Sequence, residues 1–248
     1  MHLIKLDAIE STNDFLKHLH AQQTLPNYTV VWAANQTKGK GQMGSNWEVE
    51  PFKNLTFSIL IKEVNIAKEK LFDLNKIVSL AVLEVLQDFK IQDISVKWPN
   101  DILSGNQKLG GILIENQWKI SGEIHAVVGI GLNVNQRKFE QLPHANSLHL
   151  LTNKEYDLQF LLELIVQKVK ETYEKYLLLK NELSKTYLEH LYKRNVPTVF
   201  ENPSGHRFMG IIRDVLPNGK LWMELEDDQF QSFEIKEINM LVNVSSTL

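Results

Sequence analysis

The chain has 248 residues, of which 43% are hydrophobic and 23% are charged, enough for one large domain or for a medium domain and a small one. Its net charge of −3 excludes a basic nucleic-acid-binding surface spread over the whole chain. The absence of cysteine excludes disulfides, thiolate nucleophiles and cysteine-ligated metals. The N-terminus lacks the apolar run of a signal peptide, and no segment has the roughly 20 uncharged apolar residues of a membrane span. We therefore expect a soluble, cytoplasmic protein.

The first segments alternate between predicted strands and helices. A short strand is expected at 2–7, followed by a helix at 11–22 that Ser11 or Thr12 can cap. Capping is one function of these two hydroxyls, and a role at a neighbouring cleft is another. Apolar runs and helical spacing then predict strands at 28–35 and 55–61 and a well-buried helix at 68–89.

A meander of strands is expected in the next part of the chain. Its apolar runs lie at 94–103, 108–116 and 123–135, and the turn residues Ser104–Gln107 separate the first two. A polar loop is predicted at 136–147. The segment 157–192 has helical spacing almost throughout, which is typical of core and domain packing.

The pattern changes near Asn195. Beyond it, short apolar runs are separated by turn residues at 202–205 and 216–219, which predicts a small antiparallel barrel. The sequence therefore predicts an α+β protein: a mixed β-sheet domain backed by helices at 1–195, and a small β-barrel at 196–248.

A glycine-rich motif lies in the segment Gln36–Trp47, which reads QTKGKGQMGSNW. Gly39, Gly41 and Gly44 have the G-x-G-x-x-G spacing of a dinucleotide-binding turn. The residues that follow lead into a second strand rather than a helix, so the helix that would hold a pyrophosphate is missing. The glycines instead allow backbone N–H groups to form an anion-binding nest, and Lys38 and Lys40 add positive charge beside it. A flexible surface loop is the alternative interpretation.

The segment KWPND places several polar residues at the end of an apolar run. Lys97 ends the run, Asn100 and Asp101 follow, and Lys108 comes seven residues after Asp101. If the turn at Ser104–Gln107 closes a hairpin, Asp101 and Lys108 lie near the same end of neighbouring strands. An acid, an amide and two lysines near a glycine-rich turn suit a nucleotide with its magnesium ion. The alternative is a surface Asp–Lys pair that contributes little to stability.

Five motifs together resemble the biotin–protein ligase (biotin–[acetyl-CoA-carboxylase] ligase) family. In chain order they are ESTN, QTKGKGQMGSNW, KWPND, KLGGILIE and VVGIGLNVN, and they extend over about residues 5–135. The later segment MGIIRDVLPNGKLWMEL resembles the small SH3-like domain of this family. The resemblance implies a class II synthetase-like biotin/lipoate ligase fold with a C-terminal SH3-like barrel.

The resemblance also implies a two-step reaction. The family joins the carboxylate of biotin to the α-phosphate of ATP, releasing pyrophosphate and forming biotinyl-5'-AMP. It then transfers biotin to a lysine of the biotin carboxyl carrier domain of acetyl-CoA carboxylase or a related carboxylase. ATP and Mg²⁺ are the implied cofactors, and biotin is the implied substrate.

Functional residues carry over where this sequence matches the motifs. Lys108 matches the catalytic lysine, and Asp101 matches the acid that assists the chemistry, through magnesium or the incoming amine. The implied biotin contacts are Ser11, Thr12, Asn13, Gln36, Gly39, Lys40, Gly41 and Gly111. The implied adenylate or ATP contacts are Lys40, Gln42, Trp47, Lys97, Asn100, Lys108 and Asn133, the last of which reads adenine.

The sequence departs from the family pattern in two places. The family often has G-R-G-R-x-G where this chain has Lys40 and Gln42 in place of the arginines, and glutamine carries no charge. We hypothesise that phosphate retention is weaker here, or that another cation such as Lys53 substitutes. In addition, ESTN begins at residue 10, which leaves no room for the N-terminal DNA-binding domain of some members. We therefore expect no repressor function and no DNA partner.

Other functions are weighed against this one. A lipoate–protein ligase or octanoyltransferase of the same superfamily would have a longer apolar pocket, and a non-catalytic biotin-binding module would need no nucleotide contacts such as Asn133. A nicotinamide-dependent oxidoreductase is a distant third. A homodimer through an edge strand stays open. The loops 36–47 and 136–146 are expected to be mobile without ligand and to order over the adenylate.

Overall fold

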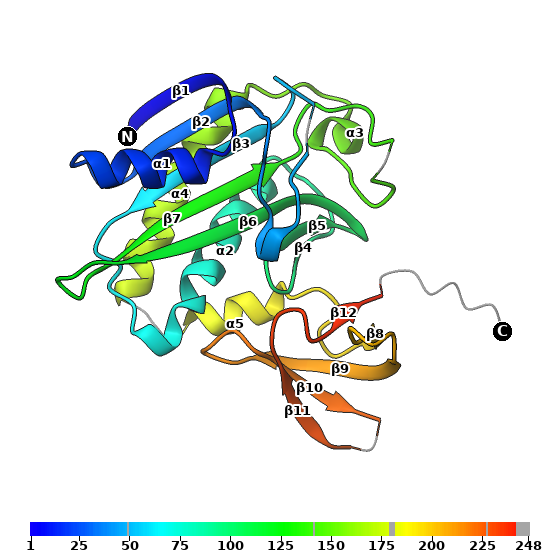
Figure 1. The fold of residues 1–248 in the computed structure, drawn as a ribbon. Helices are drawn as coiled ribbons and strands as arrows, with labels where there is room; N and C mark the ends of the chain where they lie inside the picture. Colours follow the sequence, from blue (N-terminus) through cyan, green and yellow to red (C-terminus); the bar gives the residue numbers. More distant parts are fainter. Residues whose placement is uncertain (49, 141, 179–181, 227, 242–248) are drawn as a thin grey trace.

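The computed structural model describes residues 1–248 except 49, 141, 179–181, 227 and 242–248. It contains a seven-stranded sheet and a five-stranded sheet, with helices against the larger one (Figure 1). The strands of the large sheet are β1 (His2–Ile9), β2 (Thr29–Gln36), β3 (Leu55–Ile61), β4 (Ile94–Lys97), β5 (Asp101–Ser104), β6 (Gln107–Trp118) and β7 (Ile124–Leu132). The helices are α1 (Thr12–Gln22), α2 (Phe72–Asp88), α3 (Leu148–Thr152), α4 (Leu158–Leu178) and α5 (Glu182–Glu189), with short 3-10 turns η1 (Gln42–Gly44) and η2 (Lys68–Lys70).

The large sheet is mixed, with strand order β1-β2-β3-β7-β6-β5-β4. β1 and β2 run parallel, and the other neighbours are antiparallel. Both faces are covered, because side chains of a strand point alternately to opposite faces. Phe57 and Ile59 of β3 belong to the main core with α2 and α4, whereas Leu60 packs with Leu16 of α1 on the other face. The mixed sheet backed by helices is therefore as expected.

The N-terminus of α1 lies at the edge of a cavity. Ser11 is its N-cap, and the Ser11 hydroxyl accepts a hydrogen bond from the Asp14 backbone N–H at 3.4 Å. Thr12 is the first helical residue, so Ser11 rather than Thr12 has the capping role. This cap places two small polar side chains where the helix begins, directly after β1.

The predicted strand at 94–103 is instead two strands. The cis peptide bond between Trp98 and Pro99 lies between β4 and β5, which pair antiparallel with Lys97 opposite Asp101. Proline cannot donate to a strand ladder, which explains why the pairing stops there. The predicted hairpin turn at Ser104–Gln107 is confirmed, because β5 pairs antiparallel with β6 across it.

The helices differ from the sequence prediction in two places. The helix expected at 68–89 begins as the 3-10 turn η2 and becomes α-helical at Phe72. α3 was not predicted, since it has five residues and too few turns to show helical periodicity; Ser147 caps it by accepting from the Leu150 N–H at 3.2 Å. Of the helices in the described ranges, none combines the length and apolar character needed to cross a membrane.

β4 forms one edge of the large sheet, and this edge is bonded to the chain that follows α5. The Val96 N–H donates to the His190 carbonyl, and the Tyr192 N–H donates to the Val96 carbonyl, both at 2.9 Å. These two bonds occupy the outer side of β4 with a segment that leads into the small sheet. The β4–β5 hairpin is thus fixed on both sides.

The C-terminal sheet is antiparallel, with strand order β11-β10-β9-β8-β12, as an SH3-like domain requires. Its strands are β8 (Pro197–Glu201), β9 (Arg207–Val215), β10 (Leu221–Leu225), β11 (Phe230–Phe233) and β12 (Asn239–Met240). β11 ends at Phe233, and β12 comprises only Asn239 and Met240. The domain limits 1–195 and 196–248 stay a prediction, although the small sheet begins two residues after Asn195.

Candidate active site

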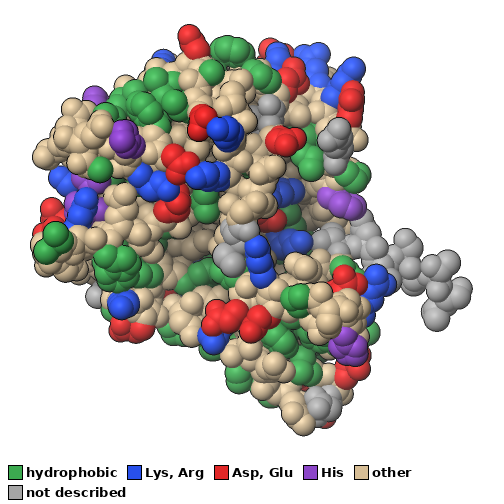
Figure 2. All heavy atoms as spheres, in the orientation of Figure 1, with side chains coloured by type: hydrophobic (Ala, Val, Ile, Leu, Met, Phe, Trp, Pro, Cys, Tyr) green, Lys and Arg blue, Asp and Glu red, His purple; other side chains and the backbone are tan. Residues whose placement is uncertain are grey.

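A cavity of about 280 Å³ lies where the strand ends of the large sheet meet the small sheet. Its walls come from the start of α1, the glycine-rich loop, the Lys97–Asp101 segment, β6, β7 and the C-terminal sheet. In Figure 2 the surface is hollowed between the larger body and the smaller lobe, with charged side chains of both signs at the margins. Most predicted site residues line this cavity: Ser11, Thr12, Asn13, Gln36, Lys40, Gly41, Gln42, Trp47, Lys97, Asn100, Asp101, Lys108 and Gly111.

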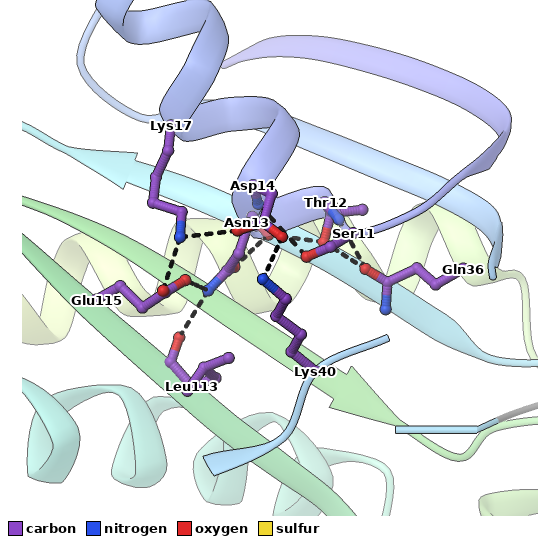
Figure 3. Close-up of polar contacts among 10 residues, drawn as sticks. Ser11, Thr12, Asn13, Asp14, Lys17, Gln36, Lys40, Leu113 and Glu115 are labelled. Atoms are coloured by element: carbon purple, nitrogen blue, oxygen red, sulfur yellow. Dashed lines mark hydrogen bonds and ion pairs between the residues drawn. The ribbon is translucent and has the colours of Figure 1, made fainter. Parts of the chain in front are cut away.

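One end of the cavity is a neutral hydrogen-bonding niche. The Thr12 hydroxyl donates to Gln36 Oε1 at 3.0 Å, and the Thr12 backbone N–H donates to the same oxygen at 2.7 Å (Figure 3). Ser58 Oγ lies 2.7 Å from Thr12 Oγ1 and 2.6 Å from Asn13 Oδ1. The single proton of Ser58 serves one of these contacts at a time. The Ser11 hydroxyl proton and the Gln36 amide N–H groups remain as donors for a polar ligand.

Asn13 is held from three sides. Its amide nitrogen donates to the Leu113 carbonyl at 3.3 Å and to Glu115 Oε2 at 2.7 Å, while its oxygen accepts from Ser58. A Cβ at Gly129 would lie 2.5 Å from Asn13 Oδ1, so the amide is packed directly on the β7 backbone. Because its amide groups already have protein partners, Asn13 shapes the niche.

An ion-pair network surrounds the start of α1. Lys17 Nζ lies 2.7 Å from Glu115 Oε1 and 2.8 Å from Asp14 Oδ1, and Lys40 Nζ of the glycine-rich loop lies 2.5 Å from Asp14 Oδ2 (Figure 3). Burial alone would raise the pKa of Asp14, but the hydrogen bonds from Lys17 and Lys40 bring that pKa below its usual value. Through Asp14, the loop lysine is tied to the same helix that carries the neutral niche.

The other end of the cavity is charged. Lys108 Nζ and Asp101 Oδ1 are 2.6 Å apart, across the β5–β6 hairpin. Lys97 faces the same space from β4, and no hydrogen bond or ion pair joins its amino group to another described residue. Burial lowers the pKa of Lys97, the nearby Lys108 lowers it further, and Asp101 opposes both. Two cations facing one carboxylate leave this end with spare positive charge for an anion.

Asn100 has a structural bond as well as a place at the cavity. Its side-chain amide nitrogen donates to the Ile112 carbonyl at 2.6 Å, and its backbone carbonyl accepts from the Ile112 N–H at 3.0 Å. The side chain is buried. Asn100 therefore secures the turn after Pro99 to β6, which fixes Asp101 relative to Lys108.

The glycine-rich loop folds back on itself. The Trp47 N–H donates to the Gly39 carbonyl at 2.9 Å, and a Cβ at Gly39 would lie 2.3 Å from the Trp47 carbonyl oxygen. Gly39 is thus required by this close approach and is not among the residues that line the cavity. The Trp47 ring lies against Gly131 of β7, and Lys108 Nζ is 5.7 Å from its centroid. Lys53 is not among the lining residues either.

Asn133 lies just outside the cavity. It is buried, and its amide nitrogen donates to the Asn146 carbonyl at 3.1 Å. Asn146 in turn belongs to the segment that bonds Lys108, whose backbone N–H donates to the His144 carbonyl. The second amide N–H and the amide oxygen of Asn133 have no hydrogen-bond partner among the described residues, so the bond to Asn146 does not prevent an adenine contact. The adenine role stays a prediction.

Ser58 and Glu115, two residues that bond side chains of the niche, were not identified from the sequence. Ser58 lies in the middle of an apolar strand, and Glu115 follows an apolar run, so neither looked like part of a site. Ser58 has no exposed surface, and a fully buried hydroxyl in a run of apolar residues is the signal that would have indicated it. Glu115 is joined to Asn13 across 102 residues of sequence, a separation that no local pattern reveals.

Known proteins are similar to this chain in both sequence and fold. A bifunctional ligase/repressor BirA of Bacillus spizizenii is 33% identical over 136 residues, which cover 55% of this chain and 41% of that protein. The match therefore spans about two fifths of the length of this relative. A biotin–[acetyl-CoA-carboxylase] ligase of Mycobacterium tuberculosis is 26% identical over 199 residues, covering 79% of this chain and 73% of that protein.

Solved structures support the fold over nearly the whole chain. A biotin protein ligase from Aquifex aeolicus, in complex with biotin and ATP, has a TM-score of 0.78 and 25% identity, with 97% of this chain and 98% of that chain covered. The model described as the biotin/lipoate A/B protein ligase family matches residues 6–135, more than half of the 248 residues. The chain belongs to the biotin/lipoate A/B protein ligase family.

Proposed function

We propose that this protein activates biotin with ATP as biotinyl-5'-AMP and then transfers biotin to a lysine of a biotin carboxyl carrier domain, as in acetyl-CoA carboxylase or a related carboxylase. The observation that carries the proposal is the division of one cavity into a neutral hydrogen-bonding end and a lysine-rich end. A polar, uncharged ureido ring suits the first end, and phosphate and carboxylate oxygens suit the second.

The ureido ring would lie at the niche of Ser11, Thr12 and Gln36. Its carbonyl oxygen is an acceptor and matches the free donors of Ser11 and Gln36, whereas its N–H groups match hydroxyl oxygens of the niche. An unmatched polar group buried there would cost on the order of 1–3 kcal/mol. The hydrogen bonds among Thr12, Gln36 and Ser58 hold these groups in place before biotin arrives.

In the first step an oxygen of the biotin carboxylate attacks the α-phosphorus of ATP. A new P–O bond forms to the acyl oxygen, the bond to the bridging oxygen breaks, and pyrophosphate leaves. Both reactants are anionic, so positive charge must be present where they meet. Lys108 and Lys97 supply that charge, and Asp101 fixes the position of Lys108.

In the second step the neutral amine of the carrier lysine attacks the acyl carbon, the bond from that carbon to the phosphate oxygen breaks, and AMP leaves. The Asp101 carboxylate would accept the proton that the nitrogen loses. Asp101 lies at the charged end, where that amine would enter. Trp47 and the glycine-rich loop would shield the mixed anhydride from water.

The residues present fit a magnesium ion that arrives with ATP. Asp101 is the one carboxylate among the described residues that line the cavity, and no group of three or more metal-ligating side chains occurs in the described ranges. Mg²⁺ usually binds through one or two carboxylates together with substrate phosphates. When bound, it would supply further charge screening at the phosphates, with Asp101 as its protein ligand.

A lipoate- or octanoate-specific relative is the alternative. The hydroxyls and amides of the niche favour the ureido ring, because an apolar acyl tail would leave them unpaired. Pyrophosphate release from ATP should therefore occur with biotin and not with lipoate, and an apo carrier domain should then become biotinylated. Release with lipoate but not with biotin would overturn the proposal.

A further inference from the structure

The turn between β9 and β10 joins the small sheet to the body of the protein. It comprises residues 216–219 and is closed by two backbone hydrogen bonds: the Gly219 N–H donates to the Leu216 carbonyl at 2.8 Å, and the Leu216 N–H donates to the Lys220 carbonyl at 2.9 Å. The sequence indicated a turn here but gave it no function. The contacts of Gly219 now suggest one.

Gly219 is held between two side chains of the large domain. The Trp98 indole N–H donates to the Gly219 carbonyl at 2.9 Å, and this bond is buried and links residues 121 positions apart. On the other side, a Cβ at Gly219 would lie 2.6 Å from Cδ2 of Phe72, the first residue of α2. Gly219 also has φ +90, a region that favours glycine. Conformation and space both require glycine here.

Trp98 lies in the segment that carries the charged end of the cavity. It directly follows Lys97 and precedes Asn100 and Asp101, and all four line the cavity. Leu221, two residues after Gly219, lines it as well. The bond from Trp98 to Gly219 therefore connects the small sheet to the backbone between Lys97 and Asp101. Among the described residues, the side-chain hydrogen bonds of Ser11, Thr12 and Gln36 stay within the first turn of α1, β2 and the neighbouring β3.

We infer that the Gly219 turn, held between Trp98 and Phe72, is a positioning element that sets the Lys97–Asp101 segment for the nucleotide. The inference rests on the proposed function, since it names a group that prepares the ATP end of the same site. It predicts that disturbing the turn weakens use of ATP while binding of biotin is retained. A role confined to stability would affect both substrates together.

The decisive variant is Gly219→Ala, with Gly205→Ala as its matched control. Both glycines lie in turns of the small sheet at φ +82 to +90, so alanine is strained in both, but a Cβ at Gly205 has nothing within 4 Å. We expect Gly219→Ala to raise KM for ATP or lower kcat by about tenfold or more, because small misplacements of reacting groups are costly. The Kd for biotin should stay within about twofold. Gly205→Ala should change neither quantity.

A rescue separates the contact from general damage. Phe72→Leu makes room for the added Cβ, so the double variant with Gly219→Ala should recover ATP use. Trp98→Phe, which removes only the indole N–H and part of the ring, should reproduce the ATP defect and serves if Gly219→Ala does not fold. Equal losses for ATP and biotin, or an unchanged KM and kcat in both Gly219→Ala and Trp98→Phe, would overturn the inference.

A ligand-free measurement separates failure of this inference from failure of the proposed function. Amide hydrogen exchange over 94–101 should become faster in Gly219→Ala and stay unchanged in Gly205→Ala. If the parent forms no biotinyl-5'-AMP but the exchange difference appears, the turn still positions the segment and the proposed reaction is wrong. If the parent forms biotinyl-5'-AMP but exchange over 94–101 is the same in Gly219→Ala as in the parent, only the inference about the turn is wrong.

Discussion

The two ends of the cavity are built on different physical principles. At the neutral end, Thr12 is hydrogen-bonded to both Gln36 and Ser58, so the niche is organised by the protein itself. At the charged end, the Lys97 amino group has no hydrogen bond or ion pair with another described residue, and Lys108 is paired with Asp101, the one carboxylate there. The comparison teaches that shape and polarity are prepared in advance for one substrate, whereas charge is left for the other substrate to neutralise.

The largest expected effect tests the charged end. Lys108→Ala should lower the rate of pyrophosphate release by about 100- to 1000-fold, because removing one group that stabilises developing charge typically costs that much. The measurement is pyrophosphate release with biotin and ATP, followed separately by transfer from supplied biotinyl-5'-AMP. Lys38→Ala is the control: Lys38 is an exposed lysine of the glycine-rich loop, paired with Glu10 at 2.6 Å and absent from the cavity wall. Equal losses in both variants would remove the distinction between the two ends.

The second effect tests the neutral end. Ser58→Ala should raise the Kd for biotin by about tenfold while kcat changes little, because Thr12 and Asn13 lose a shared buried partner. Calorimetric titration with biotin measures it. Thr56→Ala is the control, since the Thr56 hydroxyl is also buried on β3 but donates to the Ala33 carbonyl instead. If Ser58→Ala impairs ATP use while biotin binding survives, the assignment of the two ends is reversed.

The third effect concerns the loop between the two ends. Gln42 lines the cavity where many family members have arginine, and Lys53 does not line it. Gln42→Arg should therefore reduce release of free biotinyl-5'-AMP severalfold, through an added charge at the phosphate, while Lys53→Ala should leave release unchanged. Quantifying released adenylate against enzyme-bound adenylate decides between them. Equal release from the parent and Gln42→Arg would sink the hypothesis.

The smallest expected effect lies away from the cavity. It tests whether ionisable groups outside the cavity also change the stability of the protein. His20 of α1 and His125 of β7 are buried with their ring nitrogens 2.8 Å apart. Burial lowers the pKa of both; Lys119 and Lys62 lower them further, and Glu123 and Glu63 oppose this at His125.

The sign follows from proton uptake. Below about pH 6.5 the unfolded chain gains protons that the folded protein does not yet accept, so the free energy of unfolding should fall as pH drops from about 6.5 to the lowered pKa values, and stay level above that range. Denaturant unfolding at several pH values checks this, and His20→Gln should flatten the slope. An identical slope in both proteins would show that these histidines stay uninvolved.

Local features of the fold were predictable from sequence, because local rules govern them. The cap at Ser11, the strand at 55–61 and the hairpin that joins Asp101 to Lys108 all follow from short patterns of side chains and turn residues. The interruption at Trp98–Pro99 was also predictable, since the apolar run ends at Lys97 and proline cannot donate to a strand ladder.

The parts that escaped prediction depend on distant residues. Ser58 and Glu115 entered the site only through bonds to α1, and Asn133, which is bonded to Asn146, is not among the residues that line the cavity. Such contacts are set by tertiary packing, which no local pattern of apolar and polar residues encodes. The expected ordering of the loops at 36–47 and 136–146 on ligand binding stays a prediction.

The bonds from Val96 to His190 and Tyr192 bear on how two copies of the chain could meet. Because the outer N–H and C=O of Val96 are already bonded, a further strand could not pair along the full length of β4. Within the described part of the chain, β1 is the opposite border of the large sheet, with β2 as its partner in the strand order. For a dimer that extends this sheet from copy to copy, β1, the first strand of the chain, is therefore the more open edge.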